Sequence, residues 1–398
     1  MRRFLFISLV IALAALVAAR SSLLPEESVE ASAYDPGYGF NMLELGAPAA
    51  GETAGSAMLA EMNEYFFSRT PTAKSAVTGA FRGKNLILIC ADSWSPDPTN
   101  RRLNPALSRL WREGARMSNV YRPDWYQGQE GREFALLSGL MPVRVDDKTA
   151  LTWIGEQNTF LPFALARRLR EGGYDTLAYI RSESHRPAYE VLGFSAVSVT
   201  DGAAEAAAAA AGEDRPAGRR FFAFYLWTDP DCEAALSLLL DALADSGHRE
   251  DTALCLLTAG REPDRAQLFL WAEGMQAPTA GIPCSELDVT PTLLNLLGLS
   301  FDSRFLSGRD IFAENSAPGE ASAAMPLVSL HGSAYSDWIS DAGFYSAAES
   351  VFLPEGACFK SAEETVRYAQ TVCGMVYDRY VFARRALEYN YFQLALAP

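Results

Sequence analysis

Asp92 has the clearest chemical setting of any acidic residue in this 398-residue chain. It directly follows residues 85–91, a segment that is apolar from Leu86 onward and so predicts a strand buried in a parallel sheet. Ligands of α/β proteins bind at the carboxyl ends of such strands. A carboxylate there could hold a divalent cation, and such a cation could act as a Lewis acid on a bound substrate.

Histidines that could complete a metal site with Asp92 are scarce, because the chain has only three. His185 follows a predicted core strand and so belongs at the same edge of the sheet as Asp92. We expect His248, in a polar turn, to be solvated. His331 ends a strand-like segment far from the other motifs. One carboxylate without an imidazole partner is a poor site for a transition metal.

A site made only of oxygen ligands is an alternative. Asp229 and Asp231 follow another predicted strand, and together with Asp92 and water they could hold Mg²⁺ or Ca²⁺. The residue types alone do not decide between this site and no metal site.

The overall charge limits the partners of the chain. The formal net charge is −15, from 49 acidic and 34 basic residues, which argues against binding to nucleic acid and against loose adhesion to anionic lipid. An anionic ligand would have to be bound by a local group of positive side chains. The hydrophobic fraction of 49% is enough to build a large core.

The N-terminus predicts export. Residues 1–20 begin with Met1-Arg2-Arg3, continue with about 16 apolar residues and resemble a signal peptide or a short membrane anchor. Val17-Ala18-Ala19 could serve as a cleavage site, so the chain is expected either anchored to the cytoplasmic membrane, on its extracytoplasmic face, or secreted. Residues 21–57 are small, acidic and rich in Pro and Gly, and we interpret them as a tether.

Six cysteines are too few for a disulfide framework in a chain of this length. Cys90 and Cys255 lie in strand-like segments and are expected to be buried. Cys358 and Cys373 lie in polar sequence and could form a disulfide in an oxidising compartment. The sequence alone does not decide whether they do.

Strand-like and helix-like segments alternate through residues 58–325, which predicts an α/β domain with a mainly parallel central sheet and helices on both faces. Residues 326–398 are expected to complete this domain with a small α+β portion, ending in a helix over 362–388. An alanine run at 206–211 is interpreted as an exposed linker. The predicted strands are 85–91, 176–180, 221–227, 252–257 and 267–271, and the predicted helices 58–69, 104–113, 160–171, 232–246 and 288–297.

Four blocks of this pattern together resemble one family, the lipoteichoic acid synthase-like branch of the alkaline phosphatase/sulfatase superfamily. The most specific block runs without a gap from Pro283 through Asp288-Val289-Thr290-Pro291-Thr292 to Phe312. The resemblance covers roughly residues 64–344 and implies the fold of that family. The other three blocks are 81–94, 125–142, which contains Glu133-Phe134, and 163–179.

The resemblance also implies a set of metal ligands and a nucleophile. Members of the family hold one divalent cation, Mn²⁺ or Mg²⁺, with an acidic residue after the first strand, a threonine nucleophile at a helix start, an Asp-His pair after a later strand and a further histidine. The first position falls on Asp92, shorter than the usual Glu. The nucleophile position falls on Gln129, beside Glu130, and the Asp-His pair falls on Gly260 and Arg261. The loop for the further histidine is reduced to residues 228–231.

These replacements predict an exported or membrane-anchored pseudoenzyme of the cell envelope that needs no cofactor. We expect Arg261 either to pair with Asp92 or Glu130 or to point into solvent. Partners would be the cytoplasmic membrane, through residues 1–20, and an anionic glycerol-phosphate polymer or an envelope protein. The alternatives are an active metal-dependent phosphoglycerol transferase or phosphoester or sulfoester hydrolase with rearranged ligands, and a purely structural domain.

Overall fold

The computed structural model describes residues 39–43, 54–125, 128–200, 219–227, 231–275, 278–313, 325–326, 337–356 and 358–396. These all fall within one unit, Pro36–Pro398. The predicted leader at 1–20, the linker at 206–211 and the strand-like segment at 327–331 lie outside the described residues, as does most of the predicted tether at 21–57.

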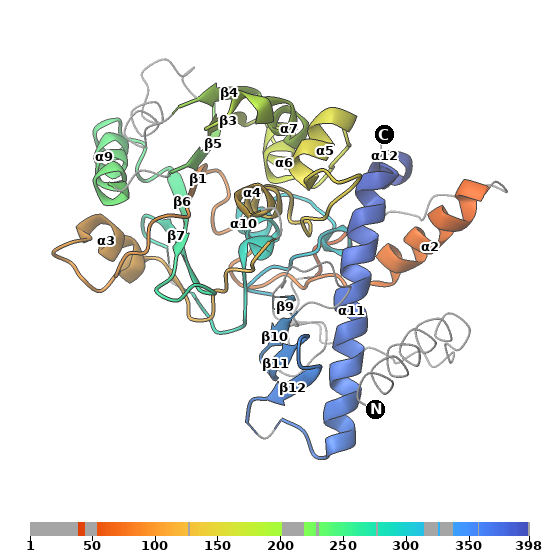
Figure 1. Ribbon diagram of the computed structural model, residues 1–398. Coiled ribbons are helices and arrows are strands. Elements are labelled where there is room, and N and C mark those ends of the chain that lie inside the picture. Colours follow the sequence, from red (N-terminus) through yellow and green to blue (C-terminus); the bar gives the residue numbers. More distant parts are fainter. Residues whose placement is uncertain are drawn as a thin grey trace. The chain divides into compact units, whose positions relative to one another are not determined.

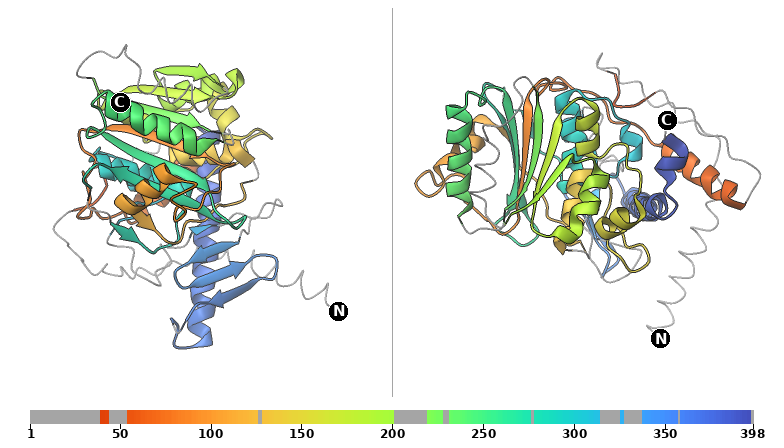
Figure 2. Two further views of the ribbon diagram at one scale, coloured as in Figure 1. Left: turned by 90° about the vertical axis from the view of Figure 1, so that its left-hand side faces the viewer. Right: turned by 90° about the horizontal axis from the view of Figure 1, so that it is seen from above.

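An eight-stranded sheet forms the centre of the fold (Figures 1 and 2). Its order is β4-β3-β5-β1-β6-β7-β2-β8, and the first five strands in that order run parallel. β7 is antiparallel to both of its neighbours. The sheet is therefore mainly parallel, as the sequence predicts. The strands are β1 (Asn85–Ala91), β2 (Ala115–Met117), β3 (Asp175–Ile180), β4 (Ala196–Val199), β5 (Phe221–Leu226), β6 (Thr252–Ala259), β7 (Ala266–Ala272) and β8 (Thr279–Ala280).

Helices cover both faces of this sheet because the central strands are apolar on both sides. Leu86, Leu88 and Cys90 of β1 join the larger core cluster, whereas the alternate residues Ile87 and Ile89 join the smaller one. The helices on the smaller cluster's side are α3 (Pro105–Glu113) and α9 (Cys232–Asp245), and those on the other side are α4 (Gly128–Ser138), α5 (Ala150–Gln157), α6 (Leu165–Glu171), α7 (Arg186–Leu192) and α10 (Val289–Leu297) (Figure 2).

One predicted helix is shorter than expected. The segment predicted as 160–171 becomes helical only at Leu165. Pro162 disfavours the helical conformation at the residue before it, and Ala164 has an extended backbone with ψ of 137°. The predicted helix at 58–69 corresponds to α2 (Ala54–Ser68).

The C-terminal part is a small antiparallel sheet packed on a long helix, α11 (Ala362–Glu388), which has both ends where the sequence predicts them (Figure 1). Trp338 is fully buried between them and stacks on Tyr345 and Phe352. The sheet has the order β12-β11-β10-β9, with strands β9 (Met325–Pro326), β10 (Trp338–Ser340), β11 (Gly343–Ser346) and β12 (Val351–Pro354).

Aromatic side chains join the two ends of the described chain. Tyr65 of α2 stacks on Phe382 of α11 with ring centroids 3.9 Å apart. Tyr391, in the last helix α12 (Tyr391–Leu396), donates a hydrogen bond of 2.8 Å from its hydroxyl to Asn63 Oδ1. The C-terminal helices thus pack against the start of the domain.

The cysteines in the described residues are all free. Cys90 and Cys255 are buried, as predicted. Cys373 Sγ accepts a hydrogen bond of 3.3 Å from Trp338 Nε1, and Cys358 is exposed, so the two are not bonded to each other. Within the described part of the chain, none of the helices combines the length and the apolar character needed to cross a bilayer.

Candidate functional site

Asp92 is held by two arginines at the carboxyl end of β1. The alternation of side chains along the strand puts Asp92 on the same side as Cys90, toward α4. Arg132 of α4 donates from Nε to Asp92 Oδ2, and Arg122 Nη2 lies 3.7 Å from the same oxygen. The side chains of Asp92 and Arg132 are only 14% and 13% exposed. The carboxylate is therefore already neutralised by the protein.

The opening turns of α4 carry the residues that surround this pair. Gln129, Arg132 and Glu133 share one face, because residues three and four positions apart are neighbours on a helix. The Gln129 side chain is hydrogen-bonded to the Glu133 carboxyl group. An amide cannot act as a nucleophile, so Gln129 supports its buried neighbour and offers no attacking group.

Glu130 lies at the rim of the same helix end. Its Oε2 accepts a hydrogen bond of 2.6 Å from Thr149 Oγ1, and its Oε1 lies 3.3 Å from His185 Nε2. His185 ends the short 3-10 helix η1 (Glu183–His185) after β3. Of the three histidines, His185 thus joins the predicted site residues, whereas His248 is exposed as expected and His331 lies outside the described residues.

Two buried carboxyl groups lie close to the Asp92–Arg132 pair. Glu133 Oε2 accepts a hydrogen bond of 2.6 Å from the Tyr189 hydroxyl, and Glu286 Oε1 accepts one of 2.5 Å from Trp125 Nε1. The second oxygen of Glu286 is buried and has no hydrogen-bond partner in any other residue that the structure describes. Burial raises the pKa of each of these glutamates to about 7.

Electrostatic interactions connect these carboxyl groups to the pair. The charge on Asp92 contributes to the raised pKa of both Glu133 and Glu286, and the charge on Arg132 opposes it at Glu286. Burial acts to lower the pKa of Arg132, but its ion pair with Asp92 and the charge of Glu286 outweigh burial and raise it. Arg132 is thus strongly held in its charged form.

Gly260 and Arg261 lie in the turn between β6 and β7. The Gly260 N–H donates a hydrogen bond of 2.8 Å to the Arg265 carbonyl oxygen, which closes the turn tightly. A Cβ atom at Gly260 would lie 2.7 Å from Arg265 Cβ and 2.8 Å from the backbone of that residue. The turn therefore has no room for the aspartate that the family carries here.

Arg261 points away from the site. Its guanidinium pairs with Asp97, and its side chain is 72% exposed. The pairing of Arg261 with Asp92 or Glu130 is therefore wrong, and the alternative that Arg261 points into solvent is confirmed. The turn directs position 261 outward, and Arg132 takes the place beside Asp92 that was expected for Arg261.

The residues at this site do not fit a divalent cation. Of the two Asp92 oxygens, Oδ2 accepts from Arg132 and Oδ1 accepts from Cys90 Sγ at 3.7 Å. Position 129 carries an amide and position 260 has no side chain. Among the described residues, no three His, Cys, Asp or Glu side chains are grouped as metal ligands. Asp231 is exposed at the start of α9, and Asp229 lies outside the described residues.

Sequence reasoning missed Arg132, Arg122 and Glu286. A signal for Arg132 is present, because it stands three residues after Gln129 and so one helical turn further along the same face. Arg122 and Glu286 gave no such signal. Arg122 lies after β2 and Glu286 begins the 3-10 helix η2 (Glu286–Asp288), and the packing of the fold brings both to β1.

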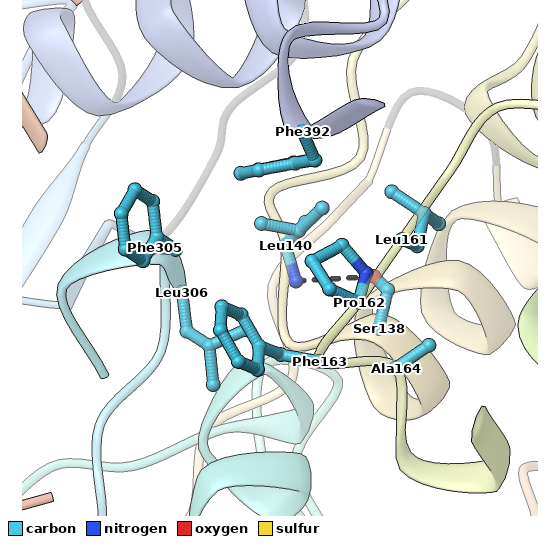
Figure 3. Close-up of a pocket in the computed structure, with 9 residues that line it drawn as sticks. All are labelled: Ser138, Leu140, Leu161, Pro162, Phe163, Ala164, Phe305, Leu306 and Phe392. Carbon is cyan, nitrogen blue, oxygen red and sulfur yellow. Dashed lines mark hydrogen bonds between the residues drawn. The ribbon is translucent and has the colours of Figure 1, made fainter. Parts of the chain in front are cut away.

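A small pocket elsewhere in the fold lacks the chemistry of a reactive site (Figure 3). Ser138 is the only polar residue of its lining, and its hydroxyl is engaged, donating to Phe134 O and accepting from Leu140 N. The apolar lining residues are Leu140, Leu161, Pro162, Phe163, Ala164, Phe305, Leu306 and Phe392.

No protein-family model and no curated protein matches this sequence. Solved structures do match. The lipoteichoic acid synthase LtaP from Listeria monocytogenes is similar over 83% of this chain and 97% of its own, with 16% identity and a TM-score of 0.55. A protein of the alkaline phosphatase superfamily from Vibrio parahaemolyticus is similar over 86% of this chain and 98% of its own, with 15% identity and a TM-score of 0.56.

These similarities agree with the arrangement of the elements. A mostly parallel sheet between two layers of helices, followed by a small antiparallel sheet, is the architecture expected from the sequence blocks. At these identities the likeness concerns the fold, and the activity has to be argued from the site. This chain has the sulfatase-like, lipoteichoic acid synthase-like fold of the alkaline phosphatase superfamily.

Proposed function

We propose that this chain is a catalytically inactive member of the superfamily, exported or anchored at the membrane by residues 1–20, with a binding or structural role in the cell envelope. The observation that carries the proposal is the ion pair of Asp92 with Arg132. The carboxylate that would hold a cation is occupied by a positive side chain of the protein itself.

The chemistry of the neighbouring positions supports inactivity. Attack on a phosphate or sulfate ester needs an activated hydroxyl group, and Gln129 offers an amide in its place. Loss of a nucleophile typically costs several orders of magnitude in rate. The turn at Gly260 leaves no space for a carboxylate that could help to bind a metal.

The partner we propose is an anionic glycerol-phosphate polymer of the envelope. Arg122 supports this choice, because its side chain is 26% exposed and its contact with Asp92 is a long one of 3.7 Å. A phosphate group could therefore bind to Arg122 at the mouth of the site without breaking the closer pair. The alternative partner is an envelope protein that covers the same mouth of the site, and the binding test below distinguishes the two.

Activity assays on the purified full chain test the proposal. The substrates are a lipid-linked glycerophosphate and aryl esters of phosphate and sulfate, each with Mn²⁺ or Mg²⁺. We expect no turnover above the rate of Asp92→Ala, which lacks the one carboxylate left at the family's ligand positions. Turnover by the wild type that Asp92→Ala abolishes would show an active enzyme with rearranged ligands.

Binding is measured separately, by titrating the chain with glycerol-phosphate polymer. We expect saturable binding that Arg122→Ala weakens and added salt reduces. The matched control is Arg144→Ala, since Arg144 is a comparably accessible arginine, 37% exposed, whose ion pair is with Asp147 and not with Asp92. Equal binding by all three proteins would exclude the mouth of the site as the polymer's binding place.

A further inference from the structure

Around Asp92, acidic side chains face positive charge, as they do in a metal site, but the positive charge comes from arginine side chains and not from a metal ion. Asp92, Glu133 and Glu286 bring three carboxyl groups to the end of β1, two of them buried. Arg132 and Arg122 bring two positive charges to a single oxygen of Asp92. Two guanidinium groups carry the same charge as one divalent cation.

Glu286 is a buried carboxyl group that would lack a positive partner if Arg132 were absent. The side chain is 1% exposed, and its Oε2 has no hydrogen-bond donor from another residue in the described part of the chain. A buried carboxylate oxygen without a donor is costly unless a positive charge lies close by. Arg132 is the positive side chain that interacts with it electrostatically.

We infer that Arg132 is the resident cation of this site and that its guanidinium takes the electrostatic role of a divalent ion. It neutralises Asp92 directly and opposes the effect of the Asp92 charge on Glu286, so no ion has to be recruited from solution. A guanidinium suits this role, because it stays charged at every physiological pH and its planar array of N–H groups can serve more than one acceptor.

The inference deepens the proposed function, because it concerns the same site. It makes a claim that the activity assays do not test: Arg132 keeps divalent cations from Asp92, and without Arg132 the Asp92 carboxylate becomes free to take one. A chain that turned over no substrate and yet bound Mn²⁺ tightly would contradict this inference and leave the proposed inactivity standing.

The experiment compares the wild type with Arg132→Gln, which keeps most of the side-chain volume and removes the charge. Thermal unfolding is followed in EDTA and in millimolar Mn²⁺, and Mn²⁺ binding is measured by electron paramagnetic resonance. We expect the wild type to bind no Mn²⁺ and to melt at the same temperature in both buffers. Arg132→Gln should melt several degrees lower in EDTA, and Mn²⁺ should restore much of that loss.

Two further variants locate the effect. Arg132→Gln combined with Asp92→Asn should lose the response to Mn²⁺, because the direct ligand is gone. Arg261→Gln, an exposed arginine on the neighbouring turn, should behave as the wild type. If Arg132→Gln does not fold in EDTA, recovery of folded protein with Mn²⁺ supports the inference.

Three results would overturn it. The first is Mn²⁺ binding by the wild type, and the second is an Arg132→Gln variant as stable as the wild type in EDTA. The third is a destabilised variant that Mn²⁺ neither binds nor restores, because Arg132 would then be an ordinary ion-pair partner.

Discussion

Arg132 and Asp92 are 40 residues apart in the chain and form one ion pair, with Arg132 Nε donating to Asp92 Oδ2. The pair joins the first helix turns of α4 to the end of the central strand β1. Both side chains are mostly buried, so each depends on the other for compensation of its charge.

Replacing Asp92 with Ala should destabilise the protein by about 3 kcal/mol, because Arg132 and Arg122 would then be like charges without their shared acceptor. Urea unfolding followed by circular dichroism measures this loss. The matched control is Glu156→Ala, which breaks the exposed pair with Lys148 and should cost less than about 1 kcal/mol. Equal losses of stability in both variants would show that the buried ion pair stabilises the protein no more than an exposed one.

Replacing Gly260 with Ala should cost about 1–3 kcal/mol, because the new Cβ would lie within 2.8 Å of Arg265 in a closed turn. Gly281→Ala is the control, since a Cβ there meets only Ser118 Oγ, at 3.8 Å. Its change should stay within about 0.5 kcal/mol. An unaffected Gly260→Ala variant would mean that the turn can open to accept a side chain.

Glu133 should make stability fall as the pH rises from about 4.5 to about 7. Burial raises the pKa of this carboxyl group from its ordinary value of 4.5 to about 7, so the folded state keeps a proton that the unfolded chain loses in this window. The contribution is complete below pH 4.5 and lost above pH 7, and it amounts to at most about 3 kcal/mol.

Glu133→Gln tests this, because the amide resembles the protonated acid and does not titrate. Urea unfolding at pH 4.5 and 7.5 should show that the variant gains stability relative to the wild type at the higher pH. Glu156→Gln, on an exposed side chain, is the control and should show no such gain. A Glu133→Gln variant whose difference from the wild type is independent of pH would refute the assignment.

Cys358 should be the fast-reacting thiol of the native protein. It is exposed, whereas Cys90, Cys255 and Cys284 are buried, and burial raises the pKa of the Cys373 thiol. Titration with a thiol reagent without reductant should give one rapid equivalent that Cys358→Ser removes. The absence of any rapid reaction in the wild type, and its appearance after reduction, would indicate a bond between Cys358 and Cys373.

The core elements could be predicted because the apolar residues in their sequences follow the pattern of the strand or helix that they form. The apolar run of β1 and the pattern of α11 fix both ends of each element. The antiparallel direction of β7 could not be predicted in this way. It depends on the short turn at Gly260, which returns the chain beside β6 without a crossover helix.

The site was only half predictable. Asp92 follows from its place after β1, and the replacements at Gln129 and Gly260 follow from matching the blocks. The partner of Asp92 could not be found in the same way, because positive side chains on several loops were equally suitable by sequence. Arg261 was chosen for its position in a family motif, whereas the packing of α4 against β1 selects Arg132.

The hydrogen bond from Trp125 to Glu286 places an indole ring directly on a carboxyl group that titrates near neutral pH. A change in the charge of that carboxyl group alters the electric field across the ring, and the emission spectrum of tryptophan responds to such a field. The emission of Trp125, one of seven tryptophans in the chain, should therefore respond to the charge of Glu286.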